Sequence, residues 1–240
     1  IEAGYSSIDH IDGFVEALVP GIERMTDQQA GLFGMFVGDK ADESGIPKLM
    51  AALKEKNIWV VPTQSLAERW FAPTYNEDEF ANDPESKYMN PKTVEQWIAS
   101  KKNLRSNELY NEASMEKFIQ LRRKLILECQ KNGVGLLLGC DAPQVFNVPG
   151  FSTHHELAYL VGCGLTPYEA LRTGTVNVAK YLKLTDSGII RKGAIADLVL
   201  LQSNPLSDIT NSQKIEGVFI RGNYLSKEEI AASLKKLEKR

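Results

Sequence analysis

The sequence predicts an α/β fold in which parallel strands alternate with helices. Two segments are almost continuously apolar, residues 57–63 (NIWVVPT) and residues 134–140 (VGLLLGC). Such strands are typical of a parallel sheet covered on both faces, because neither face meets water. Helical patterns with one apolar face separate the strands. This alternation favours right-handed βαβ units, so we expect one parallel sheet with helices packed against it.

The elements of the predicted sheet follow one another in three units. A short strand over 6–10 comes first, and a helix with one apolar face follows over 47–56. The strand over 57–63 is followed, much later, by a helix over 114–132, which a glycine closes. The strand over 134–140 begins the third unit. We therefore expect three strand–helix units.

Two long segments interrupt these units, residues 12–46 and 64–113. Each follows a strand, so each is expected on the side of the sheet where α/β sites are built. The second segment is rich in aromatic residues: Trp70, Phe71, Tyr75, Phe80, Tyr88, Trp97 and Tyr110. A segment of this length is expected to be a lid, a binding element or disordered, or its aromatic residues form a small core of their own.

Capping patterns predict where the next helices begin. Thr153 and Glu156 have the spacing of a capping box, and so do Thr166 and Glu169. The second pattern also carries a proline at the first helical position, and it introduces a helix that is expected to reach about residue 183.

The pattern changes after residue 186. Short strands are predicted over 196–202 and 217–221, and a charged helix is predicted from Ser226. The expected organisation has three parts: a portion of a barrel (1–187), a small β-sandwich segment (188–225) and a C-terminal helix (226–240).

Three βα units cannot close a barrel. A barrel of eight such units needs about 250 residues, so the three units are expected to be the last part of one whose earlier strands precede residue 1. Residues 1–4 (IEAG) support this expectation, because they have the pattern of a final helical turn with a glycine C-cap. A small open α/β sheet is the alternative, and spacing alone leaves it open.

Composition excludes several classes of protein. The chain is 43% hydrophobic and 25% charged, as in ordinary globular proteins. Its net charge of −3 provides no broad basic surface for nucleic acid. No apolar run approaches the roughly 20 residues that cross a bilayer, so no membrane partner is expected.

The three cysteines lack the spacing of a zinc motif, and phosphate-binding loops and the GxSxG motif are absent. The compartment and the oligomeric state stay open, a homo-oligomer included.

Two polar residues stand where the predicted strands end. His10 follows the first strand and Asp141 follows the third. Side chains at the C-terminal ends of parallel strands point into the region where α/β sites form. For His10 the alternative is a local hydrogen bond, and for Asp141 it is a cap on the next turn. His154 and His155 are adjacent, so they cannot form the i, i+4 pair of a zinc helix.

Several motifs, in order, resemble the metal-dependent amidohydrolases. The stretch AGYSSIDHIDG is similar to the sixth barrel strand of that family, NIWVVPT to the seventh and VGLLLGCDAP to the eighth. The run FSTHHELAYLVGCGLTPYEALRTGTVNVAKYL, followed by GAIADLVLL and NPLSDI, is similar to the family's C-terminal signature. The resemblance is strongest to imidazolonepropionase-like and Xaa-Pro or Xaa-Arg dipeptidase-like enzymes, and it covers most of the chain.

The resemblance implies a site and a reaction. His10 matches the metal-ligand histidine of the sixth strand, and Asp141 matches the aspartate of the eighth strand, which binds metal and moves protons. His154 matches a histidine that we interpret as a substrate contact. The implied enzyme uses one or two divalent ions, expected to be zinc, and hydrolyses a C–N bond in an amide, a dipeptide or a cyclic amide.

Part of the family pattern has no counterpart in this chain. The HxH pair of the first strand, the lysine or glutamate of the fourth and the histidine of the fifth are missing, and the chain has three histidines in all. We expect those ligands upstream of residue 1, so this chain alone is expected to bind metal weakly and to be inactive. The alternatives are a non-catalytic, barrel-derived binding or assembly module and a related deaminase.

Overall fold

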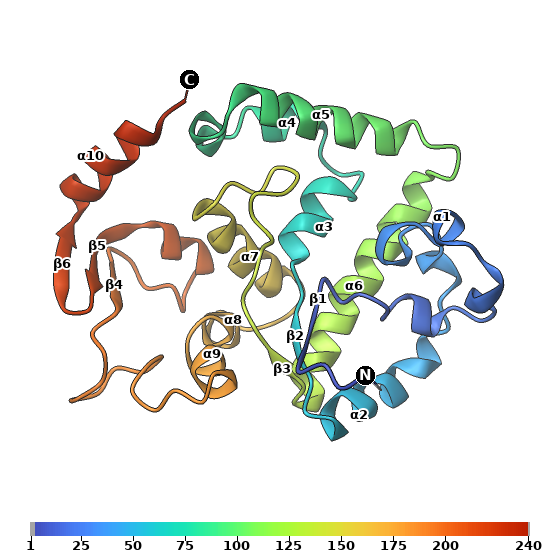
Figure 1. The fold of residues 1–240 in the computed structure, drawn as a ribbon, viewed down its shortest axis with the longest axis horizontal. Coiled ribbons are helices and arrows are strands. Elements are labelled where there is room, and N and C mark those ends of the chain that lie inside the picture. The colour runs from blue at the N-terminus through green and yellow to red at the C-terminus, as the bar shows by residue number, and fades with distance from the viewer. Residues whose placement is uncertain (1–2, 240) are drawn as a thin grey trace.

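A three-stranded parallel sheet forms the centre of the molecule (Figure 1). The computed structural model describes residues 3–239, so the helical turn predicted to include residues 1 and 2 lies outside the described residues. The strands are β1 (Ser7–Asp9), β2 (Trp59–Val61) and β3 (Gly135–Leu136), in the spatial order β1-β2-β3. All pairings are parallel, which confirms the predicted mixed α/β class with a parallel sheet.

Two helices cover this sheet and close its core. α2 (Ile46–Glu55) packs on α6 (Glu112–Asn132), and α6 contacts β3. The two helices agree with the predicted ones to within two residues at each end. Buried apolar side chains fill the space between helices and sheet, among them Met50, Leu53, Val60, Phe118, Ile119, Leu125 and Leu136. Burial of each such side chain stabilises the fold by about 1.5–3 kcal/mol.

One glycine in the sheet is required by close packing. A Cβ atom on Gly135 would lie 2.3 Å from the ring of Trp59, its register partner on β2. The indole therefore occupies the space that a side chain on β3 would need. The bulky residue on one strand and the glycine on the next are complementary in size.

The third strand is shorter than predicted. Its ladder ends at Leu136, although the N–H of Leu137 still donates to the carbonyl of Val60. The N–H of Leu138 donates instead to the carbonyl of Thr173, in a helix outside the sheet. The apolar run 134–140 is thus buried throughout its first half but leaves the sheet before Asp141, because a different partner takes over its backbone hydrogen bonds.

The segment 64–113 is folded into helices. These are α3 (Gln64–Trp70), α4 (Glu77–Ala81), a 3-10 turn (Pro84–Tyr88) and α5 (Pro91–Arg105). Phe80 and Trp97 form a small core with Leu66, Val94, Val145, Phe146 and Val148, and Trp70 and Tyr88 pack against it. Most of the segment's aromatic residues thus pack into folded structure, as the second of the two interpretations predicts.

The helices after β3 differ from their predicted boundaries. α7 (Phe151–Gly162) begins two residues before Thr153 and has Gly150 as its N-cap, so the capping box predicted at Thr153 and Glu156 was wrong. Thr166 and Glu169 do form a capping box, at the start of α8 (Pro167–Thr173). The single helix predicted to reach residue 183 is divided, because α8 ends at Thr173 and α9 (Val176–Tyr181) follows.

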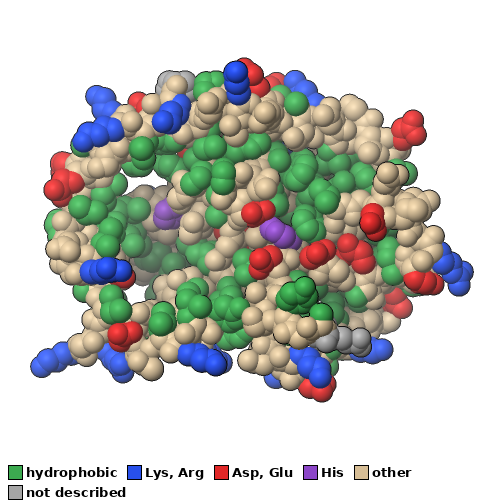
Figure 2. Space-filling model, in the orientation of Figure 1, with side chains coloured by type: hydrophobic (Ala, Val, Ile, Leu, Met, Phe, Trp, Pro, Cys, Tyr) green, Lys and Arg blue, Asp and Glu red, His purple; other side chains and the backbone are tan. Residues whose placement is uncertain are grey.

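A separate antiparallel sheet lies near the C-terminus. It contains β4 (Leu198–Leu201), β5 (Ile215–Ile220) and β6 (Asn223–Ser226), with the 3-10 turn Ile209–Gln213 between β4 and β5. β4 and β5 match the two predicted strands, and β6 was not predicted. α10 (Lys227–Leu237) follows with Ser226 as its cap, as predicted. Large apolar side chains are exposed on this unit (Figure 2), including Val199, Leu200 and Ile220.

The segment 12–46 consists of short turns around one helix, α1 (Asp27–Ala30). The 3-10 turns are Glu16–Leu18, Ile22–Arg24, Leu32–Gly34, Gly38–Lys40 and Glu43–Gly45. Among residues 3–239, none of the helices combines the length and the apolar character that crossing a membrane requires.

Candidate active site

Three polar residues leave the parallel sheet in the same unusual backbone conformation. His10 has a φ of 62°, Thr63 of 47° and Asp141 of 55°, all in the left-handed region. This conformation is uncommon for residues other than glycine and costs of the order of 1–3 kcal/mol at each position. Its occurrence after all three strands marks this edge of the sheet as the candidate site.

The structure brings His10 and Asp141 together. His10 Nε2 lies 3.8 Å from Asp141 Oδ2, and both side chains are partly exposed, at 27% and 38%. The strand ends that carry them are not adjacent in the sheet, because β2 lies between β1 and β3. Thr63, which follows β2, fills this position, and its Oγ1 lies 2.8 Å from His10 Nδ1. One side of the imidazole therefore faces Asp141 and the other is held by a hydroxyl.

The donor atoms of His10 and Asp141 suit part of a zinc site. Zinc takes histidine nitrogen and carboxylate oxygen at about 2.0–2.2 Å, so two of its tetrahedral ligand atoms lie about 3.5 Å apart. The separation of 3.8 Å between His10 Nε2 and Asp141 Oδ2 is close to this spacing. A ligating histidine also commonly bonds its second ring nitrogen to an orienting group, and Thr63 does so here. These two residues fit as two of the ligands that a four-coordinate ion requires.

A buried arginine lies behind these strand ends. Arg122 of α6 is 1% exposed and donates to the main-chain carbonyls of His10 (2.8 Å) and Pro62 (3.0 Å) and to Gln64 Oε1 (3.2 Å). Burial lowers its pKa to about 10, and nearby carboxylates, Glu156 first, oppose this shift. Sequence reasoning missed this residue, although it lies on the apolar face of the predicted helix, where a charge needs an explanation.

Glu156 joins α7 to the start of α3. Its carboxylate is fully buried and accepts hydrogen bonds from the main-chain N–H groups of Gln64 (2.9 Å) and Ser65 (2.6 Å). Burial raises the pKa of Glu156 to about 7, and the two N–H donors partly offset this effect. The carboxylate that we expected to cap its own helix thus caps the free N–H groups of another.

The structure gives His154 a different partner. Its Nδ1 lies 3.0 Å from Ser212 Oγ, in the turn between β4 and β5. Burial lowers the pKa of His154, and the neighbouring His155 adds to the effect. This hydrogen bond ties α7 to the C-terminal unit rather than to the His10–Asp141 pair.

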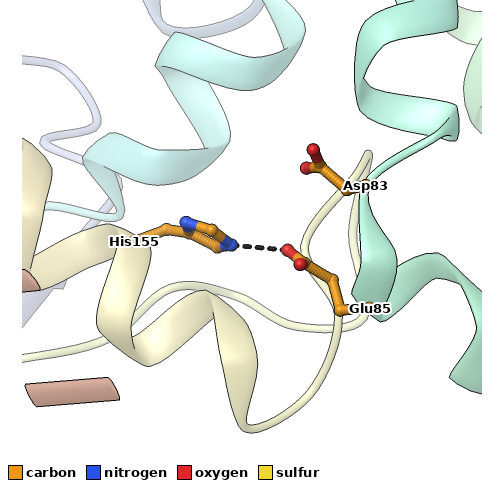
Figure 3. A group of neighbouring side chains, drawn as sticks. All are labelled: Asp83, Glu85 and His155. Atoms are coloured by element: carbon orange, nitrogen blue, oxygen red, sulfur yellow. Dashed lines mark hydrogen bonds and ion pairs between the residues drawn. The ribbon is translucent and has the colours of Figure 1, made fainter. Parts of the chain in front are cut away.

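A second group of potential ligands lies between α7 and the segment 64–113. Potential ligand atoms of Asp83, Glu85 and His155 lie within 4.8 Å of one another (Figure 3). His155 Nε2 is 2.5 Å from Glu85 Oε1. The buried Arg69 donates to Asp83 and lies 3.7 Å from Glu85. Because Arg69 pairs with Asp83, lies near Glu85 and offsets part of their charge, we interpret the group as an ionic latch that joins the two segments. His155 lies 70 positions after Glu85 in the sequence, and no motif predicted their contact.

Comparison with known proteins agrees with this architecture. Residues 24–225 match the model of the amidohydrolase family. The chain is 45% identical over 74 residues to the imidazolonepropionase of Pyrobaculum arsenaticum, a match that covers 30% of this chain and 18% of that protein. It is 38% identical over 93 residues to the ochratoxinase of Aspergillus niger, covering 37% of this chain and 18% of the relative.

A solved structure of a Xaa-Pro dipeptidase with bound methionine has a similar fold. The TM-score is 0.54 at 19% identity, and the match covers 94% of this chain and 41% of the dipeptidase chain. The chain thus spans less than half of that structure, and its matches cover less than a fifth of the two curated relatives. Since the family model matches most of the sequence, the chain belongs to the amidohydrolase family.

Proposed function

We propose that this chain supplies His10 and Asp141 to the centre of a metal-dependent hydrolase that cleaves a C–N bond in an amide, a dipeptide or a cyclic amide. The proposal depends above all on one observation, the 3.8 Å separation of the His10 and Asp141 side chains at the edge of the parallel sheet. The family membership and the names of the relatives support the same class of reaction.

In this proposal the parallel sheet is the last part of a (β/α) barrel. β1, β2 and β3 correspond to its sixth, seventh and eighth strands, and residues 188–225 belong to a small β-sandwich. The part of a longer protein that precedes residue 1 would complete both units and the ligand set. The exposed apolar residues of β4 and β5 support this arrangement, because they are surfaces that a further segment would bury.

His10 and Asp141 would hold the metal, with zinc as the expected ion. A bound divalent cation would lower the pKa of a water ligand to about 7 and polarise the carbonyl of the substrate. The hydroxyl of Thr63 keeps the His10 ring in one orientation by engaging its second nitrogen. The other ring nitrogen is thereby directed toward Asp141.

Asp141 would act as the proton carrier. Its carboxylate is partly exposed, so it can take a proton from the attacking water and release it to the nitrogen that leaves. General acid–base work of this kind contributes about 10²–10⁴-fold to the rate. The substrate contact predicted for His154 stays a prediction.

The test uses the full-length protein that contains this chain, with a panel of dipeptides, N-acyl amino acids and cyclic amides. Asp141→Asn should reduce kcat at least 100-fold while the protein stays folded, because the amide keeps the shape but cannot accept the proton. Asp9→Asn is a matched control, since it removes an exposed carboxylate one residue before His10. Full activity of Asp141→Asn would contradict the proposal, and no hydrolysis of any substrate by the unaltered protein would favour a binding module.

A further inference from the structure

We infer that Arg122 is a positioning residue for the His10–Asp141 site, because its guanidinium holds the main chain on both sides of the hydrogen bond that orients His10. The inference rests on the proposed function for its meaning, but its geometry is independent of any metal. Arg122 lies on α6, which contributes neither His10 nor Asp141.

The guanidinium is placed at the junction of two strand ends. One terminal nitrogen donates to the carbonyl of His10 at 2.8 Å, and the other donates to the carbonyl of Pro62 at 3.0 Å. Pro62 directly precedes Thr63, whose hydroxyl lies 2.8 Å from His10 Nδ1. A single side chain therefore fixes the backbone of the imidazole and the backbone of its hydroxyl partner.

Both backbones need such a constraint. His10 and Thr63 have φ angles of 62° and 47°, a conformation that persists only where the surroundings enforce it. A main-chain carbonyl that is held by a charged donor loses freedom to rotate, because a hydrogen bond to a charged group is stronger than one between neutral groups. Arg122 thus holds the carbonyl of one residue in this unfavourable conformation, His10, and the carbonyl directly before another, Thr63.

The third nitrogen of the guanidinium, Nε, is also hydrogen-bonded. Arg122 Nε donates to Gln64 Oε1 at 3.2 Å, and Gln64 Nε2 donates to Glu68 Oε1 at 2.9 Å. The opposite charges that favour the protonated form of Arg122 include Glu156 and Glu68. The buried charge of Arg122 is therefore offset by three hydrogen bonds to neutral oxygens and by these nearby carboxylates, without a salt bridge among residues 3–239. Its neighbours on the same face of α6 are apolar, among them Phe118, Ile119, Leu125 and Ile126.

The neighbouring Arg123 provides a matched control. It forms two hydrogen bonds with Glu68, at 2.7 and 2.8 Å, and its side chain is 39% exposed. Its hydrogen bonds therefore reach α3 but not the strand ends. Replacing Arg123 removes a charge and an ion pair from the same helix but leaves the hydrogen bonds of Arg122 to the two strand-end carbonyls in place, because the hydrogen bonds of Arg123 reach Arg122 only through Glu68 and Gln64.

The experiment reads the orientation of the imidazole directly. Long-range ¹H–¹⁵N spectra of the histidine rings are simple in this chain, because it contains three histidines. They are recorded without metal for the unaltered chain and for Arg122→Lys, Arg122→Met, Arg123→Met and Thr63→Val. Circular dichroism checks that each variant is folded.

Thr63→Val should shift the ring nitrogens of His10, because it removes their hydroxyl partner. Arg122→Lys and Arg122→Met should shift the same signals in the same direction and leave those of His154 and His155 unchanged. Arg123→Met should leave all three rings unchanged. If Arg122→Met fails to fold, Arg122→Lys carries the test, because lysine keeps the charge but cannot reach all three acceptors.

Zinc titration followed in the same spectra separates this inference from the proposed function. Arg122→Lys should lower the zinc affinity, measured from the zinc-dependent shift of His10, by about 10-fold or more. This is the usual effect of removing an orienting partner. Unchanged His10 signals in folded Arg122→Lys, or equal shifts in Arg123→Met, would overturn the inference. If zinc leaves His10 of the unaltered chain unshifted, the two ligands of this chain do not hold zinc by themselves, and the metal-free comparison still decides the role of Arg122.

Discussion

The carboxylate of Glu156 accepts a hydrogen bond of 2.6 Å from the main-chain N–H of Ser65, so a residue of α7 caps the beginning of α3. The second carboxylate oxygen accepts from the N–H of Gln64 at 2.9 Å, and the side chain is completely buried. This contact joins the helix that follows β3 to the helix that follows β2. It therefore stabilises the arrangement of the two strand ends that carry Thr63 and Asp141.

Glu156 should make the stability of the chain depend on pH. Burial raises its pKa from 4.5 to about 7 in the folded state. The folded protein then binds the proton more tightly than the unfolded chain, so this contribution is fully present below pH 4.5 and is lost as the pH rises through 7. The loss is of the order of 3 kcal/mol.

Urea unfolding at pH 4.5, 6 and 8 tests this contribution. The free energy of unfolding of the unaltered chain should decline between pH 4.5 and 8. Glu156→Gln should not show this decline. Glu169→Gln is the control, because hydrogen bonds at the start of α8 lower the pKa of Glu169. Its contribution to stability therefore changes with pH in the opposite direction to that of Glu156. A parallel pH profile for Glu156→Gln and the unaltered chain would contradict the assignment.

The latch between His155 and Glu85 should stabilise the segment 64–113. Burial alone would raise the pKa of Glu85, but the hydrogen bond and charge of His155 and the charge of Arg69 outweigh it and lower the pKa. Its contribution is therefore present above pH 4.5 and is lost as the pH falls below that value. At pH 7, Glu85→Gln and His155→Ala should each lower the free energy of unfolding by about 1–3 kcal/mol.

Hydrogen exchange localises this effect. Amides of α4 and α5 should exchange faster in Glu85→Gln, whereas those of α2 and α6 should not. Glu43→Gln removes a salt bridge to Lys124 in which both side chains are about half exposed, and it should leave exchange unchanged. Equal effects of the two variants would remove the special role of the latch.

Zinc should bind this chain weakly and at His10. The chain offers His10 and Asp141 at one edge of the sheet, and two ligands are fewer than the three or four of a tight site. Ring spectra should therefore show His10 shifting at zinc concentrations well above those that fill complete sites, and Asp141→Asn should reduce the shift. His155 should stay unshifted, because its Nε2 is bonded to Glu85 and Arg69 offsets part of the charge of Asp83 and Glu85. A tighter response at His155 than at His10 would show that the latch residues bind metal instead.

The contact between Gly135 and Trp59 should make alanine at position 135 destabilising. The added methyl group would lie 2.3 Å from the indole, and forcing extra volume into a packed core costs about 1–3 kcal/mol. Gly162→Ala is the matched control, since no atom lies within 4 Å of its Cβ position at the end of α7. Thermal unfolding should show a clear loss for the first variant and none for the second. Equal melting temperatures would mean that the indole can move aside.

Local patterns in the sequence determined the elements of this fold. The apolar run 57–63 predicted β2, the periodic face over 114–132 predicted α6, and Thr166 with Glu169 predicted the start of α8. These features depend on residues within a few positions of one another, so their spacing is enough to predict them. His10 and Asp141 could be nominated in the same way, because each follows a predicted strand.

The tertiary structure decided which of these residues meet. Glu156 had the spacing to cap α7, yet its carboxylate caps α3, which lies about ninety residues earlier in the chain. Thr63 and Arg122 join His10 from β2 and α6, and no local pattern records such contacts. A buried polar group takes whichever partner the packed core brings within reach, since leaving it without one costs about 1–3 kcal/mol. The sequence alone therefore determined the strands and helices with strong local patterns and two candidate residues, whereas packing decided the remaining elements and the hydrogen bonds that orient those residues.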